Sequence, residues 1–273
     1  GANLNNFLKH LDSQLHDDYI KEKFLDSGKD KEEEVYEKFT TQAPYLKGTS
    51  PLKSKLVKKV SSLGLNHYAR QYVLDRNIPS DKHYLLYHTD SFSKWSNEWC
   101  PKKLDINNDT ARLLIPLHNS ENKFIACQGR SYNKNDKLKY QTSKVHEDTQ
   151  LIFGQDRLKS NQPKFAVEGP IDSLFVDICV AVLGFNKFKL LTKDYTIIPD
   201  NDRRNSQVLK SMSNLLEMGY SMVLWPDGIE QKDINEMIMS GRTKEDIKEI
   251  INNNTYQGNM ALLKFTNWRK TNV

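Results

Sequence analysis

KFAVEGPIDSLFVDICVAVLGFNKFKLLTKDYTIIPDND, at residues 164–202, is the stretch of this 273-residue chain that decides its fold. Short apolar runs at 165–167, 180–183 and 195–198 are typical of buried strands, and the segment 171–178 between the first two has a helical pattern. The alternation continues, with a helix expected at 208–218, a strand at 222–225 and helices at 232–239 and 245–251. Regular alternation of strands and helices predicts an α/β fold built on a parallel sheet.

Acidic residues stand where these strands end. Glu168 follows the first strand directly, Asp172 comes four residues later, and Asp200 and Asp202 follow the strand at 195–198. Ligands gather at the carboxyl ends of parallel strands, so we expect the four carboxylates to converge. They would repel one another and raise one another's pKa values unless a hard divalent cation such as Mg²⁺ sat among them. Helix capping is the simpler explanation of any single one of these Asp residues, so only the ensemble indicates a metal site.

Two further positions belong to the same pattern. Gly169 directly follows Glu168, where a glycine permits a positive φ and the close backbone approach that a phosphate or metal requires. Lys232 and Asp233 stand at a helix start after the strand at 222–225 and add another acidic residue. An acidic residue at a helix start is also explained by the helix dipole alone.

The middle of the chain is basic. Formal charges sum to −3 over residues 1–50, to +8 over 51–160 and to zero over 161–273. Such a distribution suits a polyanion-binding protein with a metal site, and a solubilising surface is the alternative.

A hairpin is expected within this basic part, with strands at 112–117 and 124–130 joined by a turn at 119–122. It would bring Arg112 and Arg130 to the same edge, because antiparallel strands run in opposite senses. Phosphate is a natural ligand for two such guanidinium groups, although arginines at a surface pair more commonly with carboxylates.

The start of the chain has a different composition. Residues 1–52 are rich in Asn, Asp, Lys and Glu and predict a linker or weakly ordered arm. Helical patterns at 56–60 and 68–74 place the beginning of a folded region near residue 53. The chain opens with Gly1-Ala2 in place of Met, which suggests a fragment of a longer protein.

The composition excludes several classes of protein. No run approaches the ~18 apolar residues that span a bilayer, and no signal peptide is present, so we expect a cytoplasmic protein with no membrane partner. Cys100, Cys127 and Cys179 are isolated, with no CxxC pair. This argues against a disulfide framework and against a zinc site within this chain.

Seven short sequence motifs, or words, occur one after another along the chain. They are RLLIPL at 112–117, QGR at 128–130, KYQTS at 139–143, LIFG at 151–154, EGPID at 168–172, DND at 200–202 and KDIN at 232–235. In this order they resemble the catalytic core of DnaG-type DNA primases. The run EGPIDSLF at 168–175 is most similar to the primases of T-even-type bacteriophages.

The resemblance implies an architecture and a site. It implies a TOPRIM parallel-sheet domain at 161–250, preceded by a smaller basic α+β subdomain at 53–160 and followed by a helical segment at 251–273. The catalytic residues implied are Glu168, Asp172, Asp200 and Asp202, the metal ligands Glu168, Asp200, Asp202 and Asp233, and the nucleotide or template contacts Arg112, Arg130, Lys139 and Lys232. Whether Glu168 ligates metal or accepts a proton is left open. Tyr132 and Tyr140 are candidate stacking faces for bases, with ordinary core packing as the alternative.

The activity that follows is synthesis of short RNA primers on single-stranded DNA. It is attack of a ribose 3′-hydroxyl on the α-phosphate of a ribonucleoside triphosphate, assisted by Mg²⁺ or Mn²⁺ ions, of which more than one is expected. The resemblance also implies a hexameric replicative helicase as partner, for which the segment 261–268 is a candidate surface unless it packs onto its own domain. For a phage protein the location is the cytoplasm of the host cell.

The chain departs from the family pattern in two ways. Thr149-Gln150 stands where a basic residue often precedes the Leu-x-Gly word, and the N-terminal zinc module of the family is absent from this chain. Two other functions use the same features: a DNA-cleaving TOPRIM nuclease or topoisomerase, and a non-catalytic single-stranded-DNA-binding subunit of a replication complex. The words upstream of residue 160 favour a primase over a nuclease, and the acidic set disfavours an inert subunit.

Overall fold

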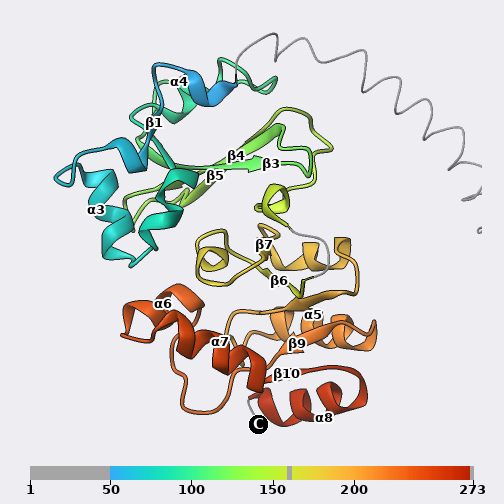
Figure 1. Cartoon of the computed structure of the whole chain (residues 1–273). Helices are drawn as coiled ribbons and strands as arrows, with labels where there is room; N and C mark the ends of the chain where they lie inside the picture. Colours follow the sequence, from blue (N-terminus) through green and yellow to red (C-terminus); the bar gives the residue numbers. More distant parts are fainter. Residues whose placement is uncertain (1–49, 159–161, 271–273) are drawn as a thin grey trace, which may run out of the picture. The chain divides into compact units, whose positions relative to one another are not determined.

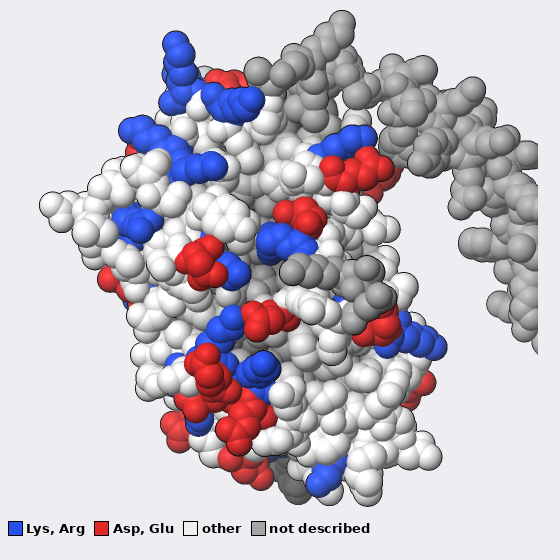
Figure 2. All heavy atoms as spheres, viewed as in Figure 1, with Lys and Arg blue, Asp and Glu red and all other residues white. Residues whose placement is uncertain are grey.

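A computed structural model describes residues 50–158 and 162–270, which contain two sheets of five strands each (Figure 1). The arm expected at 1–52 lies outside the described residues except for its last three. On the face shown in Figure 2, basic side chains spread over the part that carries the first sheet, whereas acidic side chains are most crowded near the helices α6 (Ile234–Met239) and α7 (Lys244–Asn253).

The first sheet is antiparallel throughout, with strand order β1-β2-β3-β4-β5. Its strands are β1 (Lys58–Lys59), β2 (Tyr87–Thr89), β3 (Arg112–His118), β4 (Phe124–Ser131) and β5 (Tyr140–Lys144). The predicted hairpin is therefore confirmed. The middle strand β3 is buried on both faces, because Leu113 and Ile115 pack into the main core, whereas Leu114 packs into a second cluster with Phe92 and Trp95.

Short helices surround this sheet. They are η1 (Pro51–Lys53), η2 (Val60–Ser62), α3 (Tyr68–Asp75), η3 (Ser80–Leu85), α4 (Phe92–Ser96) and, after the sheet, η4 (Gln155–Arg157). The helix expected at 68–74 is confirmed, and Asn77, with φ of 52°, ends it. The helix expected at 56–60 was wrong, because Lys58 and Lys59 pair with β2 as an edge strand and Val60 begins a 3-10 turn.

The second sheet carries the predicted alternation. Its order is β10-β9-β8-β6-β7, with the strands β6 (Lys164–Val167), β7 (Cys179–Ala181), β8 (Tyr195–Ile197), β9 (Ser221–Val223) and β10 (Thr255–Tyr256). The first four of these in the chain are parallel, as expected. The strand β10 pairs antiparallel with β9 at the edge, so the sheet is mixed rather than fully parallel.

The helices of this half are η5 (Asp172–Phe175), η6 (Phe185–Leu190), α5 (Ser206–Glu217), α6 (Ile234–Met239), α7 (Lys244–Asn253) and α8 (Gly258–Trp268). A long helix at 171–178 was wrong. Only the single 3-10 turn η5 forms, because Val176 is extended and Ile178 has φ of 52°, which turns the chain directly into β7. The C-terminal segment is helical, as predicted, and α8 packs on α5.

One core joins the two sheets. Leu113 and Ile115 of β3 and Ala166 and Ile197 of the parallel strands belong to the same buried cluster. Phe153 forms an antiparallel bridge with Ala181 in β7 and so ties the LIFG word to the second sheet. None of the described helices combines the length and apolar character needed to cross a membrane.

Candidate active site

Four acidic residues meet at the carboxyl edge of the second sheet. Glu168 follows β6, Asp172 opens η5, Asp200 lies three residues beyond β8, and Asp233 is the N-cap of α6. Asp172 interacts electrostatically with Asp233 and Asp200, and Asp200 interacts with Glu168 and Asp233. Three of the four carboxylates expected to converge, those of Glu168, Asp172 and Asp200, are therefore close enough to interact, and Asp233 joins them in place of Asp202.

Burial, and then the negative charges of Asp233 and Asp200, together raise the pKa of Asp172 to about 8. The backbone N–H of Asn235, which donates to Asp172 Oδ1 at 2.9 Å, and the guanidinium of Arg130 oppose this shift. Without a cation in the cluster, the surroundings of Asp172 thus favour its protonated form.

The pKa values of Asp200 and Glu168 are raised as well. Burial and then the charge of Glu168 raise the pKa of Asp200 to about 6, although Lys232 opposes this, with Nζ 3.5 Å from Asp200 Oδ2. Burial also raises the pKa of Glu168 against Lys232 and a hydrogen bond from the backbone of Phe185. Burial therefore raises the pKa of three of the predicted residues, and neighbouring carboxylates add to this shift at Asp172 and Asp200.

Asp202 stands apart from this group. The N–H of Asp202 donates to Asp200 O at 2.8 Å, which closes a tight turn, so the alternation of an extended chain does not apply here. Asp202 Oδ1 accepts from the backbone N–H of Asn205 at 3.1 Å, ahead of α5. Its link to the site is its attraction for Lys232.

Gly169 leaves room for Asp172. It is not among the glycines with positive φ, so the conformational reason proposed for it was wrong. A Cβ at position 169 would lie 2.6 Å from Asp172 Oδ2, which is closer than any side chain allows. The close approach expected of this glycine is thus present, with a carboxylate as the neighbour.

Basic side chains of the first half of the protein (residues 50–158) face these carboxylates, which belong to the second half (residues 162–270). Arg130 donates through Nε to the hydroxyl of Tyr72 at 2.6 Å and through Nη1 to the hydroxyl of Tyr140. Burial lowers the pKa of Lys139, and the charges of Arg130, Arg76 and Lys232 lower it further, whereas Asp233 opposes them. Three of the predicted basic residues, Arg130, Lys139 and Lys232, therefore share one electrostatic environment with the acidic cluster.

Arg112 lies elsewhere. In the observed register Arg112 pairs with Ser131, and Arg130 pairs with Leu113, so the two guanidinium groups project from opposite faces of the hairpin. The Arg112 side chain is only 4% exposed. Its Nη1 donates to Leu138 O at 2.9 Å, and its Nη2 lies 3.4 Å from Asp136. The two arginines therefore stand at the same end of the hairpin, as expected, but on opposite faces, so they do not point at one shared phosphate. Arg112 instead serves the loop that joins β4 to β5.

A residue pair that the sequence reasoning missed joins the two halves. Asn235 is 3% exposed, and its Oδ1 accepts from Arg76 Nη1 at 2.5 Å while its Nδ2 donates to Arg76 O at 2.8 Å. The guanidinium of Arg76 also lies over the ring of Tyr72, 4.9 Å from its centroid. Because the N–H of Asn235 binds Asp172, this residue connects α3 with the acidic cluster. Asn235 is the last residue of the KDIN motif, but no role was predicted for it, and no local signal in the sequence marks Arg76.

The candidate stacking faces are largely occupied. Tyr132 packs edge-on between Tyr68 and Tyr72, and its hydroxyl lies 3.0 Å from His88 Nδ1. Tyr140 carries Arg130 over its ring, 5.0 Å from the centroid. Both rings therefore pack against side chains of this protein.

The carboxylates of the acidic cluster are the right kind of ligand for a hard divalent cation, but their positions do not form a coordination site. Carboxylate oxygens are the ligands that Mg²⁺ prefers, and a cation would relieve the repulsion that raises the pKa values of Asp172 and Asp200. Within residues 50–158 and 162–270, however, no group of three or more His, Cys, Asp or Glu side chains is arranged to hold a metal ion. The predicted ligands are thus near one another without forming a coordination shell, and the Lys232 ammonium lies against Asp200.

A mostly parallel sheet with buried acids at its carboxyl edge, beside Arg and Lys from the other sheet region, is typical of enzymes that handle phosphates. The chain is 30% identical over 269 residues to the DNA primase of Enterobacteria phage T4, a match that covers 97% of this chain and 78% of that protein. The chain therefore belongs to the DNA primase family, whose members are nucleotidyltransferases that synthesise RNA primers. A scan against protein-family models found no match.

Solved primase structures share the fold. The Aquifex aeolicus primase with its zinc-binding and RNA polymerase domains is 21% identical, with a TM-score of 0.55 over 73% of this chain. The RNA polymerase domain of Mycobacterium tuberculosis primase DnaG, in complex with a DNA duplex that has a 6-nucleotide overhang, is 14% identical, with a TM-score of 0.56 over 76% of this chain and 77% of its own. The chain spans 58% of the Aquifex chain.

Proposed function

We propose that this chain is the catalytic core of a DNA primase that extends short RNA primers on single-stranded DNA in the cytoplasm of a host cell. The observation that carries the proposal is that Asp172, Asp200 and Asp233 share an electrostatic environment with Arg130 and Lys139. Carboxylates beside guanidinium and ammonium groups suit a nucleoside triphosphate together with its divalent cation. Family membership supports the same activity.

We assign the metal-binding role to Asp200, Asp233 and Glu168, because the charges of Glu168 and Asp233 both act on Asp200. Mg²⁺ or Mn²⁺ held there would lower the pKa of the attacking 3′-hydroxyl and neutralise the pyrophosphate leaving group. Asp172 supports this set from behind, with its carboxyl fixed by the N–H of Asn235. Asp202 orders the turn before α5.

We assign the triphosphate to Arg130, Lys139 and Lys232. The partners of Arg130 are the neutral hydroxyls of Tyr72 and Tyr140, so its charge is available to an anion. Arg112 is left out of this set, because its guanidinium is used within the protein. The template strand would follow the basic first half, held through its phosphates.

The helicase expected as a partner has a narrower surface than the sequence suggested. Ala261, Phe265 and Trp268 of α8 are buried, and Trp268 Nε1 donates to Trp225 O at 2.8 Å. Met260 and Leu263 are 54% and 61% exposed. A helicase contact on this helix would therefore use Met260 and Leu263.

The test is a product assay. The chain is incubated with single-stranded DNA, labelled ribonucleotides and Mg²⁺ or Mn²⁺, and labelled short RNA is the expected product. Asp200→Asn should abolish it while DNA binding persists, and Asp148→Asn, at an exposed loop position, serves as the matched control. Cut DNA would instead identify a nuclease, and DNA binding with neither product would identify a non-catalytic subunit.

A further inference from the structure

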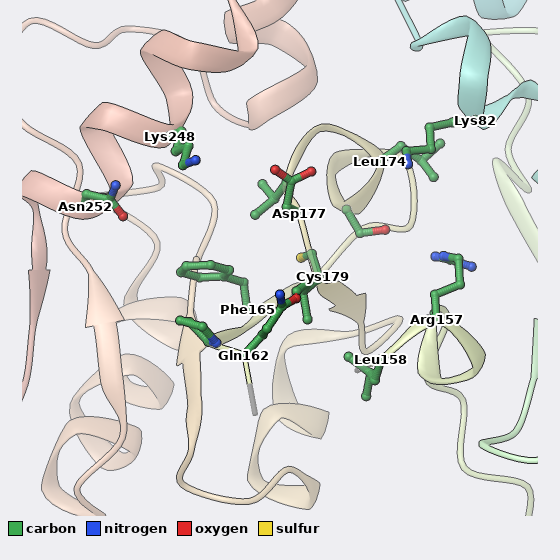
Figure 3. Close-up of a pocket in the computed structure, with 15 residues that line it drawn as sticks. Lys82, Arg157, Leu158, Gln162, Phe165, Leu174, Asp177, Cys179, Lys248 and Asn252 are labelled. Carbon is green, nitrogen blue, oxygen red and sulfur yellow. The ribbon is translucent and has the colours of Figure 1, made fainter. Parts of the chain in front are cut away.

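A cavity of about 650 Å³ lies behind the active site (Figure 3). Phe165 in β6 and Cys179 at the start of β7 line it, and these two residues are paired in the parallel register. Because β6 runs from Phe165 towards Glu168, the cavity lies at the amino edge of the strands, and the acidic cluster lies at the carboxyl edge. Its volume falls within the range of roughly 300–1,000 Å³ that small-molecule sites occupy.

One wall of the cavity is apolar. Phe165, Leu174, Val176 and Ile178 line it, and Figure 3 shows the ring of Phe165 at the side of the cavity nearest Asn252. Leu174 is 3% exposed and so forms a fixed part of this wall. An aromatic ring beside aliphatic side chains suits the flat face of a base, whereas it has no polar groups that would bind a hydrated ion.

Basic residues from three separate segments line the rest. They are Lys82 of η3, Arg157 of η4 and Lys248 of α7, against a single acidic residue, Asp177, among the described lining residues. Lys244 Nζ lies 2.6 Å from Asp177 Oδ1 and supplies most of the compensation of that charge, to which Lys248 and Lys82 add. Lys82 has an exposed partner in Asp81 at 3.2 Å, an ion pair of the kind that contributes little. One carboxylate is too few for a divalent cation, so the lining favours an anion.

Arg157 is held in place before any ligand arrives. Its guanidinium lies over the ring of Phe153, 4.5 Å from the centroid, and Nη1 lies 3.5 Å from Asp156 Oδ1. Gly154 has φ of +93°, and a Cβ there would lie 2.8 Å from Arg157 Nη2. A glycine is therefore required for the guanidinium to take this position, which Figure 3 shows on the same side of the cavity as Lys82.

We propose that this cavity binds a free nucleoside phosphate, with the phosphates between Arg157, Lys82 and Lys248 and the base against Phe165. The site shares an element with the candidate active site, because Asp172 opens η5 and the next two residues, Ser173 and Leu174, line the cavity. Occupancy would therefore be sensed at Asp172. The binding stands independently of the proposed function, and only its effect on primer synthesis rests on that function.

The experiment is calorimetric titration of the full chain with ATP in EDTA, so that a metal-dependent catalytic site is not loaded. ATP should bind with Kd below about 1 mM, and Arg157→Gln and Lys82→Gln should each weaken binding at least about tenfold. Lys248→Gln provides the same test should Arg157→Gln fail to fold, as judged by thermal melting. Lys94→Gln, an exposed lysine of α4, and Asp200→Asn should leave the affinity unchanged.

Several results would overturn the proposal. They are the absence of ATP binding at several millimolar, or binding that Asp200→Asn abolishes and Lys82→Gln preserves. Pyrophosphate that binds as tightly as ATP would rule out the nucleoside part. A 5′-phosphorylated oligonucleotide that binds at this site more tightly than ATP would identify the end of a nucleic acid as the ligand.

The effect on activity has its own measurement. ADP should change the rate of primer synthesis by at least about twofold in the parent chain, and Lys248→Gln should remove that response without altering the rate in the absence of ADP. An equal response in both proteins would show that ADP acts at the active site alone. A chain that makes no primer but still binds ATP would refute the proposed function and leave the binding site intact.

Discussion

The two halves of this protein place charge by different rules. In the second half, Glu168, Asp172 and Asp200 follow the ends of parallel strands and reach one edge of the sheet. In the first half, the antiparallel register decides which face a residue occupies, and it separates Arg112 from Arg130. Parallel strands therefore reveal their site in the order of the chain, whereas an antiparallel hairpin conceals it until the register is known.

The halves also differ in how their charges are compensated. The guanidinium of Arg112 has an acidic partner and backbone carbonyls, so it is satisfied within the protein. The acidic cluster is not satisfied, because burial and mutual repulsion raise the pKa values of Asp172 and Asp200. Uncompensated charge distinguishes the candidate functional groups from the structural ones, and the following predictions test that distinction.

The largest effect is expected within the acidic half, from a comparison of Asp233 and Asp202. Asp233→Asn should lower primer synthesis by about a thousandfold, because metal sites supply several kcal/mol of charge stabilisation. Asn caps a helix as well as Asp does, so α6 should persist. Asp202→Asn should cost less than about tenfold, because Asp202 mainly orders a turn. Single-turnover rates at saturating Mg²⁺ decide the question, and equal losses would return Asp202 to the metal site.

The next prediction compares the two arginines. Arg112→Gln should lower stability by about 3 kcal/mol, because it removes a buried guanidinium and leaves the carbonyls of Leu138 and Gly129 without their donor. At ~2–4 °C per kcal/mol this corresponds to a fall in Tm of about 6–12 °C. Arg130→Gln should instead lower primer synthesis by about a hundredfold with a smaller change in Tm.

Activity must be normalised to the folded fraction, and Arg269→Gln at an exposed position controls for loss of charge. A hundredfold loss of normalised activity in Arg112→Gln, with Tm unchanged, would contradict the assignment.

Much of the second half could be predicted from the sequence, because strand ends and acidic residues are local features. The prediction of a helix at 171–178 was wrong, because the chain has to enter β7 at Cys179 and only the short helix η5 fits before it. Asn235 and Arg76 could not be found, because their contact spans 159 positions and depends on how the two halves pack. The position of Asp202 could not be predicted either. Residue spacing suggested an extended chain, whereas the hydrogen bond from Asp202 N–H to Asp200 O forms a turn.

A smaller effect concerns pH. The pKa of Asp172 rises from 3.8 to about 8 on folding, so between these values the folded state binds more protons and stability falls as pH rises. Burial and then the charges of Asp233 and Asp200 favour the neutral acid, whereas the N–H of Asn235 and the charge of Arg130 oppose them. Asp172→Asn removes this penalty, so in EDTA its Tm should exceed that of the parent by at least about 2 °C at pH 8.5 and match it near pH 4. A variant that is less stable at pH 8.5 would show that Asp172 is ionised at little cost.

The smallest effect tests the connection between the halves. Asn235→Ala and Arg76→Ala each remove the contact that joins α3 to the acidic cluster, so their effects on primer synthesis should not add. A double-mutant cycle measures this directly. We expect a coupling of about 1 kcal/mol, or a double variant about fivefold more active than the product of the single effects predicts.

The control cycle pairs Asn235→Ala with Lys94→Gln on the exposed face of α4, where the effects should add within about 0.5 kcal/mol. The coupling should also appear in the Mg²⁺ concentration that gives half-maximal rate, because the N–H of Asn235 positions Asp172 beside the proposed ligands. A contact that only stabilises the fold would couple in Tm and leave that concentration unchanged. Additive effects on both the rate and the Mg²⁺ requirement would mean that the basic and acidic halves act independently, each positioned by its own sheet.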